Sequence, residues 1–137
     1  MPQVKYTQIT IECSGCPASV LNCASDIKAV LRSAALACNL HVLKEDLHQF
    51  NPQGITGYVL LSESHISIHT WPEEQFAIID ILSCSSINVE KVTACLRKYL
   101  LPSTINLSSH SRKIPGKNRQ KENHKVRNPS ASQVKLA

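Results

Sequence analysis

Apolar and polar positions alternate strictly over residues 65–71, "HISIHTW". A period of two is typical of a β-strand, because successive side chains point to opposite faces. One face of the predicted strand carries Ile66, Ile68 and Thr70, which we expect to point into the core. The other face carries His65, Ser67, His69 and Trp71. Each histidine taken alone is more often structural, but two imidazoles and an indole together favour a pocket or a partner surface.

Similar patterns predict the elements before this strand. Alternation around Ile9 and Ile11 predicts a first strand in residues 4–13, and residues 40–50 form a second strand of mixed quality. Between them lies a predicted amphipathic helix with Ser25 as N-cap and Asn39 as C-cap. Its buried stripe follows helical spacing and consists of Ile27, Val30, Leu31, Ala34 and Cys38.

The remaining elements follow in the same way. Residues 51–57, "NPQGITG", are expected to be a loop, and residues 58–61 a short apolar strand that enters a Ser-Glu-Ser turn. The nearly continuous apolar run at 76–84 predicts a central strand or one covered on both faces. A second helix is expected at 88–100, with one side formed by Val89, Val92, Leu96 and Tyr99.

The resulting order, β-α-β-β-β-β-α, predicts the α+β class. We expect a two-layer α/β sandwich, with a mostly antiparallel sheet and helices on one face. The predicted domain covers residues 1–110.

Charge divides the chain at about residue 110. Up to His110 there are seven Lys/Arg and nine Asp/Glu, a balance of −2, whereas residues 111–137 hold eight Lys/Arg and one Glu, a balance of +7. The C-terminal segment has few large apolar residues, so we predict a basic, disordered tail at 111–137. A solvated tail is the plain interpretation, and a contact with nucleic acid or an acidic surface is the alternative.

Hydropathy and the cysteines indicate the cellular compartment that we expect for this protein. No apolar run approaches the ~20 residues that span a bilayer, and "MPQVKYTQIT" lacks a signal-peptide core. We therefore expect a cytoplasmic protein with no membrane partner, whose six cysteines are thiols. Cys13 and Cys16 form a CxxC, but no second tight pair follows, so we predict no metal site.

A long block at residues 50–73, "FNPQGITGYVLLSESHISIHTWPE", resembles the short prokaryotic S-adenosylmethionine decarboxylase proenzymes. "IECSGC" at 11–16 and "DILSC" at 80–84 extend the resemblance, which covers roughly residues 7–100. It implies that the chain cuts itself between Glu63 and Ser64. The products would be a β chain, residues 1–63, and an α chain that starts with a pyruvoyl group made from Ser64.

The resemblance also implies residue roles. The pyruvoyl cofactor, with neither pyridoxal phosphate nor metal, would form a Schiff base with the substrate amine and accept the electrons released with CO₂. His69 would be the proton acceptor in processing, Cys84 the proton donor in catalysis, and Thr56 a support for processing where the family often has Ser. The family usually has Gly where this chain has Ser85.

The implied substrate is S-adenosylmethionine, whose decarboxylated product donates aminopropyl groups for spermidine synthesis. Phe50 and Trp71 would flank the adenine, and Glu73 would bind the ribose. The family forms homodimers, (αβ)₂, in which two sheets pack face to face in a four-layer αββα arrangement, and its active sites draw on both protomers. Two alternatives stay open: an arginine or ornithine decarboxylase on the same pyruvoyl scaffold, and a non-catalytic protein that binds nucleic acid through the tail.

Overall fold

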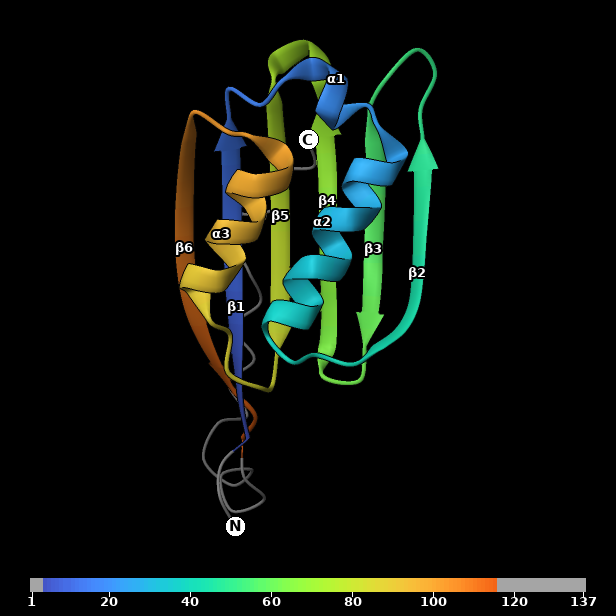
Figure 1. The fold of residues 1–137 in the computed structure, drawn as a ribbon. Coiled ribbons are helices and arrows are strands. Elements are labelled where there is room, and N and C mark those ends of the chain that lie inside the picture. Colours follow the sequence, from blue (N-terminus) through green and yellow to red (C-terminus); the bar gives the residue numbers. More distant parts are fainter. Residues whose placement is uncertain (1–3, 116–137) are drawn as a thin grey trace, which may run out of the picture.

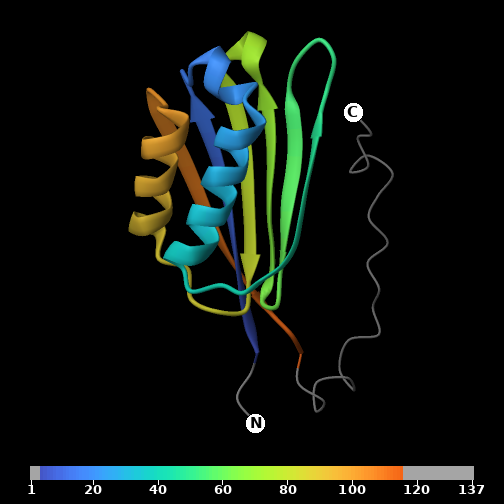
Figure 2. The same ribbon diagram turned by 45° about the vertical axis from the view of Figure 1, so that its right-hand side comes forward.

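The structure is a computed structural model, and it describes residues 4–115. It has two layers, a six-stranded sheet and a layer of helices (Figures 1 and 2). The strands are β1 (Lys5–Ser14), β2 (Val42–Gln49), β3 (Ile55–Leu61), β4 (Ser64–Trp71), β5 (Phe76–Ser83) and β6 (Thr104–Lys113). The helices are α1 (Ala18–Leu21), α2 (Ala24–Ala37) and α3 (Val89–Leu100), with the 3-10 turn η1 (Pro72–Glu74) between β4 and β5.

The sheet has the order β2-β3-β4-β5-β1-β6, and every neighbouring pair is antiparallel. Helices α2 and α3 lie side by side on one face of this sheet (Figure 1). The predicted α+β class, the antiparallel sheet and the helices on one face are therefore confirmed. β4 and β5 lie in the interior of the sheet, so both carry a hydrogen-bonded neighbour on each side.

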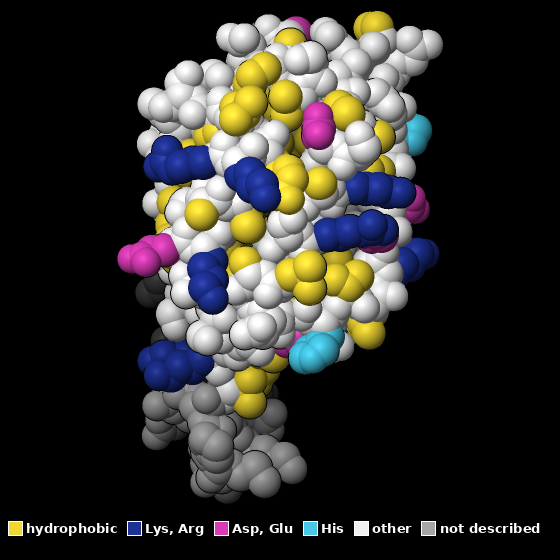
Figure 3. Space-filling view, viewed as in Figure 1, with side chains coloured by type: hydrophobic (Ala, Val, Ile, Leu, Met, Phe, Trp, Pro, Cys, Tyr) yellow, Lys and Arg dark blue, Asp and Glu magenta, His cyan; other side chains and the backbone are white. Residues whose placement is uncertain are grey.

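The core lies between the sheet and α2 and α3. The predicted stripe of α2 is buried throughout, with Ile27 fully inaccessible. In α3 the stripe is shifted, because Val92, Leu96 and Leu100 are buried whereas Val89 is exposed. Figure 3 shows the outer side of the helix layer, where Lys and Arg side chains are spread among hydrophobic ones. That mixed surface is typical of the solvent side of amphipathic helices.

The caps of α2 differ from the prediction by two residues at the N-terminus and by one at the C-terminus. The helix begins at Ala24 after Cys23, so Ser25 is not the N-cap; its hydroxyl instead lies 3.1 Å from the Cys23 thiol. The C-cap is Cys38, and Asn39 follows with a left-handed φ of 53°. Asn tolerates this conformation better than most residues, which is why it marks the helix end. The short helix α1 was not predicted from the sequence.

The predicted loop at 51–57 is too long at its C-terminal end. Ile55, Thr56 and Gly57 already belong to β3, and Ile55 is buried. Gly57 permits this because the Leu47 side chain packs directly over its Cα, where a Cβ would collide. Thr56 therefore lies in a strand, with its position set by pairing to β2 and β4.

The sequence analysis also missed β6. This edge strand pairs with β1 along ten residues, yet only Ile105 and Leu107 give it an apolar face. Its last residues, 111–113, fall in the predicted tail, so that stretch is strand rather than disordered. The rest of the predicted tail from residue 116 lies outside the described residues. In the described part of the chain, no helix has the length and apolar character to cross a membrane.

Candidate active site

Strand β4 presents the two faces that alternation predicts. Ile66, Ile68 and Thr70 point toward the helices and are at most 6% exposed. On the opposite, open face, β4 carries the histidines and Trp71, flanked by apolar side chains of the neighbouring strands. These flanking residues are Tyr58 and Leu60 of β3 and Ile78 and Leu82 of β5. Tyr58, Leu60 and Trp71 are 37–43% exposed, which leaves a large apolar area uncovered in the single chain.

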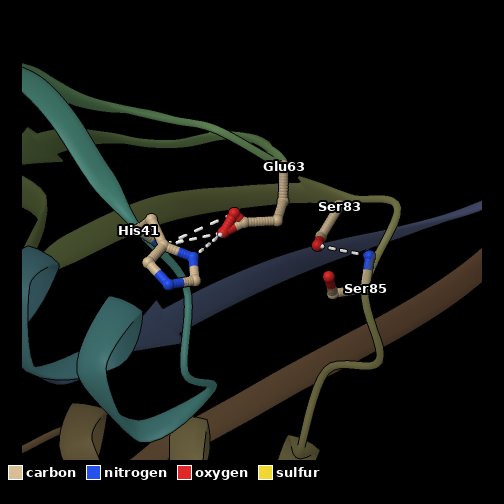
Figure 4. A network of polar contacts seen from close by, with 4 residues as sticks. All are labelled: His41, Glu63, Ser83 and Ser85. Atoms are coloured by element: carbon tan, nitrogen blue, oxygen red, sulfur yellow. Dashed lines mark hydrogen bonds and ion pairs between the residues drawn. The ribbon is translucent and has the colours of Figure 1, made fainter.

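The Ser-Glu-Ser turn joins β3 to β4 and is held by His41. The His41 carbonyl accepts a hydrogen bond from the Ser62 amide at 2.9 Å, and its own amide donates to Oε1 of Glu63 at 2.7 Å. The His41 ring reaches the same oxygen through Nδ1 at 3.0 Å (Figure 4). The His41 amide lowers the pKa of Glu63 below its ordinary value, and the ring adds to this. These contacts therefore favour the ionised form of the Glu63 side chain.

The Glu63–Ser64 peptide has two special features. The carbonyl oxygen of Glu63 accepts a hydrogen bond from the backbone amide of Cys84 at 3.3 Å. Ser64 has a φ of 153°, a conformation that is unfavourable for residues other than glycine and costs about 1–3 kcal/mol. A donor aimed at the carbonyl and a strained residue after it are both suited to attack on this bond.

The turn after β5 places Cys84 beside this peptide. The buried hydroxyl of Ser83 accepts a hydrogen bond from the Ser85 amide at 3.0 Å (Figure 4). Ser85 is not one of the described residues with a positive φ. Its backbone conformation therefore does not require glycine, the residue that the family usually has at this position. The Cys84 side chain is exposed.

A chain of side chains leads away from Ser64 on the open face. Oγ of Ser64 lies 3.4 Å from Nδ1 of His65, and Nε2 of His65 lies 3.2 Å from Oδ2 of Asp80. The other Asp80 oxygen accepts from the Gln8 amide at 3.1 Å. The sequence analysis did not assign roles to His41, Asp80 or Gln8. The strand period placed His65 on the open face, but only the register of β1, β4 and β5 brings these groups together.

The other predicted site residues gather at the opposite end of β4. Thr56 and His69 are direct cross-strand partners, and Oγ1 of Thr56 lies 3.0 Å from Nδ1 of His69. The Trp71 ring lies near His69 and Phe76, with centroid distances of 6.4 and 6.0 Å. Glu73 is exposed in η1, one residue beyond the Pro72 that ends the strand.

Phe50 belongs to the same end of the sheet, in the connection between β2 and β3. Its ring packs edge-on against His48 at 4.6 Å and is half exposed. Phe50 and Trp71 are both exposed, and the prediction that they flank adenine stays a prediction.

In a single chain, the predicted site residues therefore lie in two separate groups. Glu63, Ser64 and Cys84 lie at the end of the sheet where β4 begins, and we call them the cleavage end. Thr56 and His69 lie near the end of β4. Ser64 and His69 are five residue steps apart along an extended strand, which corresponds to about 16 Å. His69 cannot reach Ser64 of its own chain over that distance.

The CxxC pair is part of the core. Cys13 and Cys16 are both fully buried, and all six cysteines are free thiols. The Cys16 thiol and burial together raise the pKa of Cys13 well above its ordinary value. Residues 4–115 contain no group of three or more His, Cys, Asp or Glu side chains placed to hold a metal ion.

Comparison with known proteins identifies relatives along most of this length. The family described as S-adenosylmethionine decarboxylase matches residues 7–113. A proenzyme of that name from Methanococcus maripaludis strain C5 is 36% identical over 107 residues, which are 77% of this chain and 88% of the relative. Another from Sulfurihydrogenibium sp. is 56% identical over 59 residues, which are only 43% of this chain and 44% of the relative.

A solved structure has the same fold. The crystal structure of the adenosylmethionine decarboxylase from Aquifex aeolicus superposes with a TM-score of 0.73 and 31% sequence identity. The superposition covers 85% of this chain and 97% of that chain. The two-layer arrangement described above is therefore shared with that protein.

Proposed function

The chain belongs to the S-adenosylmethionine decarboxylase family, and we propose that it is a self-cleaving, pyruvoyl-dependent enzyme. It converts S-adenosylmethionine to its decarboxylated form and CO₂, and the product serves as the aminopropyl donor for spermidine synthesis. The observation that carries the proposal is the geometry of the Glu63–Ser64 peptide, a strained serine preceded by a carbonyl that already accepts a hydrogen bond. The relatives named above are all S-adenosylmethionine decarboxylases, so arginine, ornithine and nucleic acid are not favoured as ligands.

Self-cleavage begins when the Ser64 hydroxyl attacks the Glu63 carbonyl carbon. The attack is intramolecular, so it needs no encounter between separate groups. The Cys84 amide stabilises the negative charge that develops on the carbonyl oxygen, and relief of strain at Ser64 favours departure from the starting conformation. The products are the β chain, residues 1–63, and the α chain, which starts at residue 64.

The pyruvoyl group made from Ser64 supplies an electrophilic carbonyl that condenses with the substrate amine and takes up the electrons released with CO₂. Ser64 is half-buried beside the turn that ends in Cys84, which suits a site that must bind an amine and exclude bulk water. The exposed Cys84 thiol is the proton donor in the same site, because its own backbone amide already faces the Glu63 carbonyl next to Ser64.

A second copy of the chain completes the site. Ser64 and His69 of one chain are about 16 Å apart along β4, whereas the elimination that releases the α chain needs a base within hydrogen-bonding reach. The open face also exposes the apolar side chains of Tyr58, Leu60 and Trp71, as expected for a surface that packs on another sheet. We therefore propose an (αβ)₂ dimer with the sheets face to face, in which the Thr56–His69 pair of one copy serves the cleavage end of the other.

The substrate contacts follow from the same arrangement. Trp71 and Phe50 have exposed rings that offer flat surfaces to adenine and to the sulfonium charge, and the Glu73 carboxylate accepts hydrogen bonds from ribose hydroxyls.

Intact-protein mass spectrometry tests the proposal. We expect two fragments, 1–63 and 64–137, with a keto group in place of the amino group on the second, and CO₂ release from carboxyl-labelled S-adenosylmethionine but not from arginine or ornithine. Ser64→Ala removes the attacking hydroxyl and should leave one chain. Ser62→Ala in the same turn is the control and should still divide. An active wild-type protein that remains a continuous chain with an intact serine would refute the proposal.

A further inference from the structure

The first step of self-cleavage, the attack by Ser64, needs a base before the elimination that is assigned to His69. The Ser64 hydroxyl must lose its proton as it attacks, since a neutral alcohol is a weak nucleophile. His69 of the same chain is about 16 Å away, and the proposed task of His69 from the second copy is the later removal of the Ser64 α-proton. The group that accepts the hydroxyl proton is therefore a separate question.

We propose that His65 is the catalytic base that takes the Ser64 hydroxyl proton in the first step of cleavage, with Asp80 as its positioning residue. The inference rests on the proposed cleavage between Glu63 and Ser64. Nδ1 of His65 lies 3.4 Å from Oγ of Ser64, slightly beyond an ideal hydrogen bond. Catalytic hydrogen bonds are often long before the reaction begins and shorten as it proceeds.

Asp80 determines which ring nitrogen is free to accept that proton. Its Oδ2 lies 3.2 Å from Nε2 of His65, and a carboxylate only accepts hydrogen bonds. The proton of the neutral ring therefore sits on Nε2, which leaves Nδ1 as the acceptor that faces Ser64. Asp80 also stabilises the imidazolium that forms when Nδ1 takes the proton.

The carboxylate is itself held in place. Nε2 of Gln8 in β1 donates to Oδ1 of Asp80 at 3.1 Å, and Arg112 of β6 donates to the side-chain oxygen Oε1 of Gln8 at 3.4 Å. The four groups come from four strands of the sheet, so the register of β1, β4, β5 and β6 fixes their geometry. The hydroxyl, imidazole and carboxylate are linked as in serine hydrolases, but with Nδ1 facing the serine and Nε2 facing the aspartate.

The step is an isomerisation and needs no co-reactant. The O–H proton of Ser64 passes to Nδ1 of His65 while Oγ bonds to the carbonyl carbon of Glu63. The C–N bond then breaks, and the proton passes from His65 to the departing nitrogen of Ser64. The product is an ester between Glu63 and the Ser64 side chain, with a free amine at residue 64.

Hydroxylamine separates this step from the later elimination, because it cleaves esters but not ordinary amides. We expect His65→Ala to slow ester formation by about 100-fold or more, so that the chain stays whole both with and without hydroxylamine. His69→Ala should form the ester and stop there. With hydroxylamine it should yield a 1–63 fragment that ends in a hydroxamate and a second fragment that begins with an unmodified serine.

Further variants make the test specific. His65→Gln keeps a hydrogen-bond donor for Asp80 but cannot accept a proton, so it should behave like His65→Ala. It replaces the alanine variant in the test if His65→Ala has an abnormal melting temperature. Asp80→Asn should slow cleavage, and Asp80→Glu should restore part of the rate. Leu36→Ala is the control, since this exposed residue of α2 lies in the helix layer, away from the open face, and the variant should divide like the wild type.

Two results would overturn the role of His65 without affecting the proposed function. One is cleavage of the His65 variants at the wild-type rate, and the other is accumulation of a hydroxylamine-sensitive ester in these variants. A wild-type chain that stays whole would instead overturn the proposed function, and this inference with it.

Discussion

The separation of Ser64 from His69 makes a sharp prediction about mixed dimers. Five steps along β4, at about 3.3 Å each, place these residues about 16 Å apart in one chain, compared with about 3 Å for proton transfer. If His69 acts from the second copy, a Ser64→Ala chain still offers a working His69 to its partner. A His69→Ala chain still offers a working Ser64. Neither variant alone can complete cleavage, but a dimer with one of each has one complete site.

The expected yield follows from random assortment. When equal amounts of the two variants are co-refolded, about half of the dimers contain both kinds of chain, because a two-fold dimer pairs identical surfaces. Each such dimer divides its His69→Ala chain, so about a quarter of all chains should be cut. A mass tag on one variant shows which chain divides, and only the His69→Ala chain should do so.

The control replaces the Ser64→Ala chain with the double variant Ser64→Ala/His69→Ala, which offers no histidine and should rescue nothing. Denaturing mass spectrometry of the mixture measures the cut fraction. Refutation would come from a mixture that stays whole although light scattering shows mixed dimers, because His69 would then serve its own Ser64. Full cleavage of His69→Ala alone would show that another group performs the elimination.

The remaining predictions concern the turn and the core, and both use the uncleaved Ser64→Ala chain. The pKa of Glu63 is lowered in the folded state, so the His41–Glu63 contact stabilises the fold above the ordinary carboxyl pKa, and this stabilisation is lost as pH falls through the lowered value. The melting temperature should therefore exceed that of Glu63→Gln at neutral pH and approach it in acid. A difference in melting temperature that stays constant across pH would contradict this cause. Ile68→Ala removes a fully buried side chain from β4 and should lower the free energy of unfolding, measured in urea, by about 2–5 kcal/mol. The control Leu36→Ala, at a position 72% exposed on α2, should change that free energy by less than about 0.5 kcal/mol. Equal effects of the two substitutions would show that the core is misassigned.

Local pattern was sufficient for much of the fold. The alternation of residues 65–71 correctly divided β4 into a core face and an open face, because a period of two is a property of the extended chain itself. The helical stripe of α2 was equally direct. β6 was missed because an exposed edge strand with two apolar residues has almost no periodic signal, and its pairing with β1 decides its conformation.

The candidate site shows the same division. Ser64, His69 and Cys84 could be named from the sequence because a distinctive motif carries them. His41 could not, since its role depends on a backbone amide that meets the Glu63 carboxylate only when the chain before β2 passes the β3–β4 turn. Asp80 and Gln8 stand in ordinary strand sequence, and no local pattern marks either as a partner of His65.

The sequence by itself determined which residue types face each side of β4, the α+β class and the family. Those properties depend on the identity and spacing of nearby residues. The tertiary structure decided which groups meet: it placed the Cys84 amide on the Glu63 carbonyl, linked Ser64 through His65 to Asp80, and kept His69 about 16 Å away along the strand. Distances between strands depend on register and on the length of the extended chain, and these exist only once the sheet has formed.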